Sequence, residues 1–204
     1  MELHVTRAGR PLTLSVRPLT EAYLDAAAEL CDQCVGKNLY PRSYLASVLG
    51  QPDHYFDLLV TPEGRAVGYF YFYLTDLTDM AEQAKLPTER LAVVSRKADP
   101  VIANLRSIGI AEDFRSHRLS EALLRLALDR LQSATRADAA VGICWKAGGH
   151  VPMDQILHTL GFHYLSDAHR VWYDNEALVC PYCQGRCVCD AAIYYKSLGE
   201  EARI

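Results

Sequence analysis

Four cysteines gather near the end of the chain in the pattern Cys180-x2-Cys183-x3-Cys187-x-Cys189. Thiolates are soft ligands, and a tetrahedral Zn2+ ion takes four of them at about 2.3 Å. Pro181 and Gly185 allow the tight turns that would direct the four side chains inward. A closed shell of thiolates predicts a structural zinc site. An iron-sulfur cluster uses the same ligands, and free or oxidised thiols are the alternative without a metal.

The three other cysteines carry weaker signals. The total of seven is odd, so complete pairing into intramolecular disulfides is excluded. Cys31 and Cys34 fall inside a predicted helix, and we interpret them mainly as core and surface thiols. Cys144 is interpreted as a small buried apolar residue, with a covalent nucleophile as the alternative.

A second candidate functional segment runs from Arg115 to Ser120, between a predicted strand and a predicted helix. The first amides of a helix lack intrahelical partners and lie at the positive end of the helix dipole. Such a turn suits an anion such as a pyrophosphate. The alternative is an ordinary exposed turn with solvated arginines.

The segments that must position these residues alternate in type, without an internal repeat. We expect strands at Leu12 to Val16, Phe56 to Val60, Ala66 to Leu74, Val101 to Ile110, Ala139 to Trp145, His169 to Tyr173 and Ala191 to Lys196. We expect helices at Glu21 to Val35 with Thr20 as N-cap, after Pro41, from Leu119 to Leu131, and from Pro152 to Leu160 before Gly161. Residues 76–100 are predicted to form an excursion between strands, with helical content.

Composition limits the class of protein. The 204 residues are 50% hydrophobic, which predicts one domain over 1–204 with a sizeable core. The net charge is −4 and the basic residues are scattered, so nucleic acid is not an expected partner. The longest strongly apolar run, Gly68 to Leu74, is too short to cross a bilayer, and residues 1–10 lack an apolar signal region. We therefore expect a soluble, cytoplasmic protein.

The order of segments is similar to that of the GNAT superfamily of N-acyltransferases. The sequence from Ile108 to Ser120 resembles the family's strand, aromatic turn and R/Q-x-x-G-x-G/A loop, although Arg118 stands where the central glycine is usual. The resemblance implies an α+β, three-layer fold whose mixed, mostly antiparallel sheet has helices on both faces. It also implies binding of acyl-CoA by Ile108, Ile110, Arg115, Ser116, His117, Arg118, Leu119 and Ser120. Arg115, His117 and Arg118 would supply positive charge beside the pyrophosphate.

The sequence from His150 to Phe162 resembles a second family segment, N-x-x-A-x-x-x-Y-x-x-x-G-F. Leu157 occupies the position at which the family often has the tyrosine that protonates the departing thiolate. Proton transfer near neutral pH favours histidine. We therefore take His150, at the mouth of the expected cleft, as the catalytic candidate. His158 would point about 100° away from the Leu157 position on an ideal helix.

The implied reaction is direct attack of an amine on the thioester of acetyl-CoA or another acyl-CoA, with backbone amides stabilising the oxyanion. The acceptor would be an amine of a small molecule or a protein, and a second copy of the chain is a candidate partner. Two alternatives stay open. One is a catalytically degenerate acyl-CoA-binding sensor, and the other is a metal-stabilised protein-interaction module built on the cysteine loop.

Overall fold

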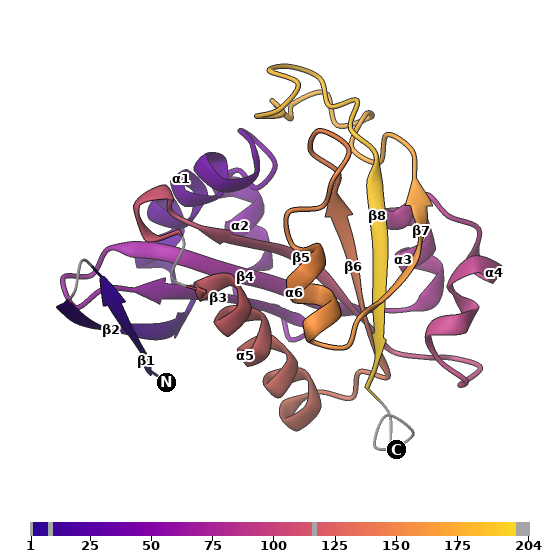
Figure 1. Cartoon of the computed structure of the whole chain (residues 1–204), viewed down its shortest axis with the longest axis horizontal. Coiled ribbons are helices and arrows are strands. Elements are labelled where there is room, and N and C mark those ends of the chain that lie inside the picture. The colour runs from indigo at the N-terminus through magenta and orange to yellow at the C-terminus, as the bar shows by residue number, and fades with distance from the viewer. Residues whose placement is uncertain (1, 8–9, 116–117, 199–204) are drawn as a thin grey trace.

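A computed structural model describes residues 2–7, 10–115 and 118–198. In these residues the core is one sheet of eight strands in the order β1-β2-β3-β4-β5-β6-β8-β7 (Figure 1). The strands are β1 Glu2–Arg7, β2 Arg10–Pro18, β3 His54–Val60, β4 Ala66–Thr75, β5 Ile102–Ile110, β6 Ala139–Trp145, β7 His163–Ala168 and β8 Ala191–Ser197. Neighbouring strands are antiparallel except β5 and β6, which are parallel. The sheet is therefore mixed and mostly antiparallel, as predicted.

Helices cover both faces of this sheet. They are α1 Leu24–Val35, α2 Arg42–Val48, α3 Leu77–Ala84, α4 Thr88–Leu91, α5 Leu119–Ala134 and α6 Asp154–Thr159. Gly109 of β5 faces α1 so closely that an added Cβ would lie 2.7 Å from Cβ of Cys34. Gly68 of β4 faces the other side, where an added Cβ would meet Leu123 of α5. We refer to these sides as the α1 face and the α5 face.

Strand β4 shows why the sheet is buried on both faces. Its side chains alternate, and Tyr69, Tyr71 and Tyr73 lie on the α1 face while Phe70 and Phe72 lie on the α5 face. Tyr69, Phe70, Tyr71 and Phe72 are each at most 4% exposed. A continuous aromatic run is thus a central strand with two cores, one against each layer of helices.

The sheet opens in its middle. Strands β5 and β6 pair only from Ile102–Leu105 to Ala139–Gly142. The register of β5 against β4 shifts between Tyr71 and Phe72, which pair with Ser107 and Leu105, so that Arg106 is an extra, bulged residue. Beyond this bulge β5 stays with β4 and leaves β6. The β6-facing edge of β5 from 106 to 110 therefore has no strand partner in the described chain.

Most predicted elements are confirmed, two expectations are wrong, and one strand was not predicted. The strand expected at His169 to Tyr173 is wrong, because β7 is formed by His163–Ala168 and residues 171–174 form a turn. Thr20 precedes a 3-10 turn, Glu21–Tyr23, and makes no capping hydrogen bond through its side chain. Strand β1, which the sequence analysis did not predict, pairs along the outer edge of β2.

The excursion between β4 and β5 is part of a second core. Met80 and Ala84 of α3 and Leu91 of α4 are fully buried, and they pack against Ile102, Val141 and Ile193 of the sheet. This segment therefore closes the α1 face over β5, β6 and β8. No described helix combines the length and the apolar character needed to span a membrane.

Candidate active site

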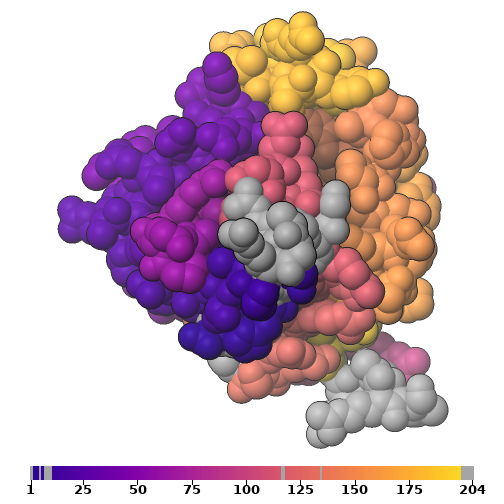
Figure 2. Space-filling view, turned by 60° about the vertical axis from the view of Figure 1, so that its left-hand side comes forward, coloured from indigo at the N-terminus to yellow at the C-terminus, as the bar shows by residue number. Residues whose placement is uncertain are grey.

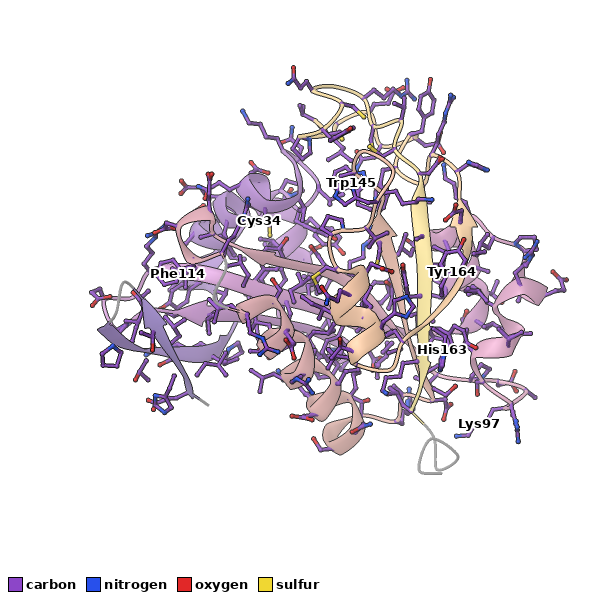
Figure 3. All side chains as sticks on the ribbon, in the orientation of Figure 1. Cys34, Lys97, Phe114, Trp145, His163 and Tyr164 are labelled. Atoms are coloured by element: carbon purple, nitrogen blue, oxygen red, sulfur yellow. The ribbon has the colours of Figure 1, made fainter. Side chains whose placement is uncertain are left out.

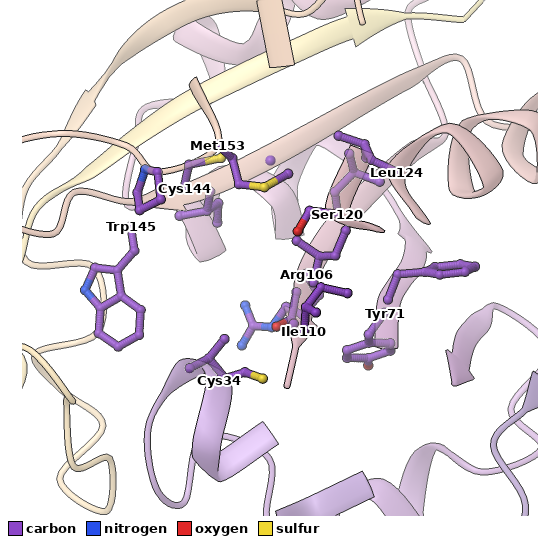
Figure 4. A pocket seen from close by; sticks show the side chains of 18 of the residues that line it. Cys34, Tyr71, Arg106, Ile110, Ser120, Leu124, Cys144, Trp145 and Met153 are labelled. Carbon is purple, nitrogen blue, oxygen red and sulfur yellow. The ribbon is translucent and has the colours of Figure 1, made fainter. Parts of the chain in front are cut away.

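A cavity of about 500 Å³ lies where β5 and β6 separate, and we call it the central cleft (Figure 4). Arg106, Ile108 and Ile110 of β5 form one side, and Cys144 and Trp145 of β6 form the other. Helices α1, α5 and α6 contribute Cys34, Ser120 and Leu157. Two of the lining residues, Cys34 of α1 and Trp145 of β6, are labelled in Figure 3. The cleft thus passes through the sheet from the α1 face to the α5 face.

The first turn of α5 borders the cleft on the α5 face. Of the residues expected to bind a pyrophosphate, Arg115 and Ser120 line the cleft, Leu119 is buried, and Ser116 and His117 lie outside the described residues. Nε of Arg115 donates a hydrogen bond to the carbonyl oxygen of Ile110, at 3.1 Å. This contact holds the base of the arginine side chain at the end of β5.

Arg118 occupies the position at which the family usually has glycine. The backbone conformation of Arg118 explains why glycine is preferred there. Its φ is 55° and its ψ is 21°, in the left-handed region that glycine adopts most easily. Its guanidinium donates to Oε2 of Glu121 at 2.7 Å, and Arg125 binds the other carboxylate oxygen at 2.9 Å. The positive charge of Arg118 is therefore partly neutralised by Glu121, so it is not fully available to a bound pyrophosphate.

Helix α6 places Leu157 in the wall of the cleft, with 3% of its surface exposed. The side chain of Leu157 can therefore contact a bound molecule, but leucine has no ionisable group and cannot act as a general acid. His150 is exposed on the loop after β6 and is not among the residues that line the cleft, although its neighbour Val151 is. Its catalytic role stays a prediction. His158 lies 3.2 Å from the carboxylate of Asp154.

A cluster of tyrosines and one histidine lies on the α1 face, and the sequence analysis did not identify it. The hydroxyl of Tyr71, which lines the cleft, is 2.8 Å from Nδ1 of His54 and 2.8 Å from the hydroxyl of Tyr44. Burial raises the pKa of Tyr71 above its usual value. Burial also lowers the pKa of His54. A neutral imidazole therefore lies one hydrogen bond behind the cleft.

The two thiols in the cleft are held in their protonated form. Burial, followed by the charge of Asp154, raises the pKa of Cys144 to about 12. Burial also raises the pKa of Cys34. Since the thiolate is the reactive form, neither residue is suited to nucleophilic catalysis at neutral pH. Cys144 is only partly buried, in the wall of the cleft, so its interpretation as a small buried apolar residue stays a prediction.

No family profile and no curated sequence matches the chain. Solved structures do. Arabidopsis thaliana NAA60 in complex with acetyl-CoA matches with a TM-score of 0.67 at 10% identity, over 91% of this chain and 98% of that one. A GNAT superfamily phosphinothricin acetyltransferase (Pat) from Sinorhizobium meliloti, in complex with AcCoA, matches with a TM-score of 0.60 at 16% identity, over 92% and 89%. The chain has the GNAT fold.

The GNAT fold by itself does not define a reaction. A GNAT-like decarboxylase, GphF in complex with isobutyryl-CoA, also matches, with a TM-score of 0.64 at 18% identity over 91% of this chain and 100% of that one. These structures support the predicted fold and its layers. The reaction has to be argued from the cleft itself.

At one end of this GNAT fold, the four cysteines of the loop come together. The sulfur atoms of Cys180, Cys183, Cys187 and Cys189 all lie within 4.8 Å of one another. Four thiolates around a zinc ion at about 2.3 Å would be about 3.8 Å apart, so the arrangement fits a tetrahedral ion. The backbone N–H of Cys183 also donates to Sγ of Cys180, at 3.3 Å. The four cysteines are thus close together both in the sequence and in the folded structure.

The cysteine loop is attached to the rest of the molecule near the cleft. Val179 exchanges backbone hydrogen bonds of 3.0 and 3.2 Å with Lys37, just after α1. The rings of Trp145 and Trp172, 5.1 Å apart, pack under the cysteines. In Figure 2 the gold surface of this loop lies beside the violet surface at the end of α1. Its residues Pro181 and Tyr182 line the cleft, so the loop forms part of the cleft wall.

Proposed function

We propose that the protein is an acyltransferase that moves an acetyl or similar acyl group from acyl-CoA to an amine of a small molecule or a protein. The observation that carries this proposal is the course of β5. Its β6-facing edge from Arg106 to Ile110 has no strand partner among the described residues, faces the cleft, and leads to the first turn of α5. Backbone groups along this edge suit the amides of a pantetheine arm, and the helix terminus suits the pyrophosphate. Ile108, Ile110, Arg115, Arg118, Leu119 and Ser120, with Ser116 and His117, are the proposed cofactor-binding residues.

The reaction would place the thioester between β5 and β6. The amine nitrogen attacks the carbonyl carbon, the C–S bond breaks, and CoA leaves as a thiolate. An ammonium acceptor gives up one proton before the attack and another from the tetrahedral intermediate, and one of the two ends on the thiolate. The protein must therefore take up one proton and orient both reactants.

Two routes are proposed for that proton. His150 is the candidate from the sequence, because a histidine titrates near neutral pH. The hydrogen bond between Tyr71 and His54 favours a second route, in which Tyr71 passes the proton to neutral His54. The two routes use residues in different parts of the molecule, His150 on the loop after β6 and Tyr71 in the wall of the cleft, so single substitutions distinguish them.

The cysteine loop is proposed to hold a structural Zn2+ through Cys180, Cys183, Cys187 and Cys189. Four thiolates fill a tetrahedral shell, which leaves no position for a reactant. An iron-sulfur cluster with the same ligands is the alternative. Bound metal would fix Pro181 and Tyr182 in the cleft wall, and no step of the transfer passes through it.

Binding of acetyl-CoA tests the proposal most directly. A specific ligand at a hundred times its Kd adds about 2.7 kcal/mol to native stability. Ser120→Glu places a carboxylate beside the proposed pyrophosphate site, and a negative charge in the first turn does not weaken the helix. We expect it to reduce the affinity for acetyl-CoA at least tenfold. Gln132→Glu adds the same charge near the other end of α5 and should leave the affinity unchanged.

Turnover separates two functions that share this binding. The apolar Leu157 favours, as a second candidate, a sensor that binds acyl-CoA without transferring the acyl group. Release of CoA thiol that depends on an added amine supports the transferase. Tight binding without release from any amine supports the sensor, and no stabilisation at millimolar acetyl-CoA would remove both candidates.

A further inference from the structure

Arg106 is the bulged residue of β5, and it lies in the wall of the cleft (Figure 4). Its Nη1 donates to Oε1 of Gln83 in α3, at 3.0 Å. Gln83 is on the α1 face, as is Tyr40, whose hydroxyl donates to the carbonyl oxygen of Arg106 at 3.2 Å. The guanidinium is therefore directed to the side of the sheet opposite α5 and the proposed pyrophosphate site.

The charge of Arg106 is not neutralised within the described residues. No carboxylate there lies within 4.0 Å of its guanidinium, and its Nε is buried without a hydrogen-bond partner. The carboxylate of Asp79, four residues before Gln83 in α3, accepts hydrogen bonds from Thr75 at 2.7 Å and Tyr73 at 3.4 Å. An arginine remains charged at every physiological pH, so an unpaired one in a half-buried cleft has a desolvation cost.

Two other arginines of this chain show what a carboxylate partner provides. Arg65 pairs with Asp113 through two hydrogen bonds, and Arg130 pairs with the buried Asp57. Arg106 has no such partner among the described residues, although it lies in the cleft wall. A ligand that brings its own negative charge would supply the missing partner.

The free donors of Arg106 suggest the shape of that ligand. Nη1 is held by Gln83, which leaves Nε and Nη2, on the same edge of the planar guanidinium, without a partner in the described residues. Nε is closed off from solvent, so a ligand reaches this edge only after the side chains that cover it move. Two parallel N–H groups on one edge match the two oxygens of a carboxylate. Tyr40 and Tyr71 line the same cleft as Arg106.

We propose that the acceptor substrate carries a carboxylate and that Arg106 binds it. This rests on the proposed acyl transfer, and it assigns the class of acceptor: an amino acid or another small amine with a carboxylate. Because Arg106 lies on the α1 face, a molecule held there would approach the thioester from the side opposite CoA. Arg106 would then orient the acceptor, while the proton leaves by another group.

The test compares each of a set of amino acids with its own carboxamide, using acetyl-CoA and thiol release. We expect kcat/KM at least tenfold higher for the acid. In Arg106→Gln this preference should disappear, through a higher KM for the acid and an unchanged KM for the amide. Arg106→Lys keeps the charge without the paired donors and should recover part of the preference. Arg17→Gln, an exposed arginine of β2, is the control and should keep all of it.

Equilibrium binding makes the test independent of turnover. Trp145 lines the cleft, so quenching of tryptophan fluorescence by the same acids and amides reports binding. Acid-selective quenching that is lost in Arg106→Gln would sustain the carboxylate site even if no thiol were released, in which case acyl transfer alone would fail. Equal binding of acids and amides by wild type would overturn the proposal. So would a dependence on Arg106 seen only with dicarboxylic acyl donors such as malonyl-CoA, which would place the carboxylate on the donor.

A structural role for Arg106 predicts a different result. Removing an unpaired cation should leave the melting temperature of the ligand-free protein unchanged or raised in Arg106→Gln. A lowered melting temperature together with unchanged selectivity would identify Arg106 as a structural residue and contradict the proposal. Gln83→Ala, which removes only the bond that orients the guanidinium, should weaken the selectivity without abolishing it.

Discussion

Arg118 shows how one residue can keep a loop conformation at an energetic cost. A side chain in the left-handed region costs about 1 kcal/mol relative to glycine. We expect Arg118→Gly to be more stable than Arg118→Ala by about that amount, since both lose the same exposed ion pair with Glu121. Urea unfolding of the two variants measures the difference directly. Equal stability would show that the backbone at this position is not strained.

The proton acceptor is also decided at the scale of single residues. If neutral His54 accepts the proton through Tyr71, activity should fall as the pH drops through the pKa of His54. Burial lowers this pKa, so the fall should lie below the usual value of about 6.5. We expect Tyr71→Phe and His54→Ala to lower kcat at least tenfold. His150→Ala is the matched test of the other route, and a large loss of kcat in this variant alone would favour His150. The pH dependence of kcat in all three variants is the measurement.

At the scale of elements, local pattern predicted most of the fold. The hairpin of β3 and β4, helix α5 and strand β6 have strong periodicity and clear turn residues, and each lies where the sequence placed it. The strand expected at His169 to Tyr173 failed because its aromatic residue Trp172 packs on Trp145 in a turn. Aromatic residues are common in strands because they pack well on a partly buried surface. Here Trp172 finds such packing in a turn, so its residue type did not require a strand.

The candidate site was predicted only in part, for a related reason. Contiguous motifs located the first turn of α5 and the four cysteines. Arg106, Tyr71 and His54 belong to different strands and have no shared motif, so only the bulge and the pairing of β3, β4 and β5 bring them together. The alternation along β4 could have grouped Tyr71 with Tyr69 and Tyr73, but it could not show which of these faces the opening.

The cysteine loop gives a prediction for one element. Cys187→Ser should lose the bound metal and lower the melting temperature, because a structural metal contributes directly to folding. Val188→Ser changes an exposed neighbour in the same loop and should do neither. Metal content by mass spectrometry is the primary measurement. Both tryptophans of the chain pack under the loop, so their emission should shift in Cys187→Ser alone. A metal content near zero in wild-type protein prepared without oxygen would exclude a tightly bound metal.

For the whole molecule, the important feature is how weakly the two halves of the sheet are joined. Strands β1 to β5 form one half and β6 to β8 the other. In the described parts of the chain, only the short parallel contact of Ile102–Leu105 with Ala139–Gly142 links them by strand pairing. A ligand in the cleft would contact both halves beyond this contact. Separation of β5 from β6 is a local fluctuation, and a ligand that contacts both strands makes this separation less favourable.

We therefore expect acetyl-CoA to slow amide hydrogen exchange on both sides of the cleft at once. Protection should increase in residues 106–110 of β5 and 142–145 of β6, and in the first turn of α5. Strands β1 and β2 lie at the far edge of the sheet and should change little, so they serve as the internal control. In Ser120→Glu the protection should be lost in all three segments together, because they respond to one ligand. Protection confined to α5 would mean that the ligand binds the helix terminus without entering the cleft, and the acyl group would then not reach the α1 face.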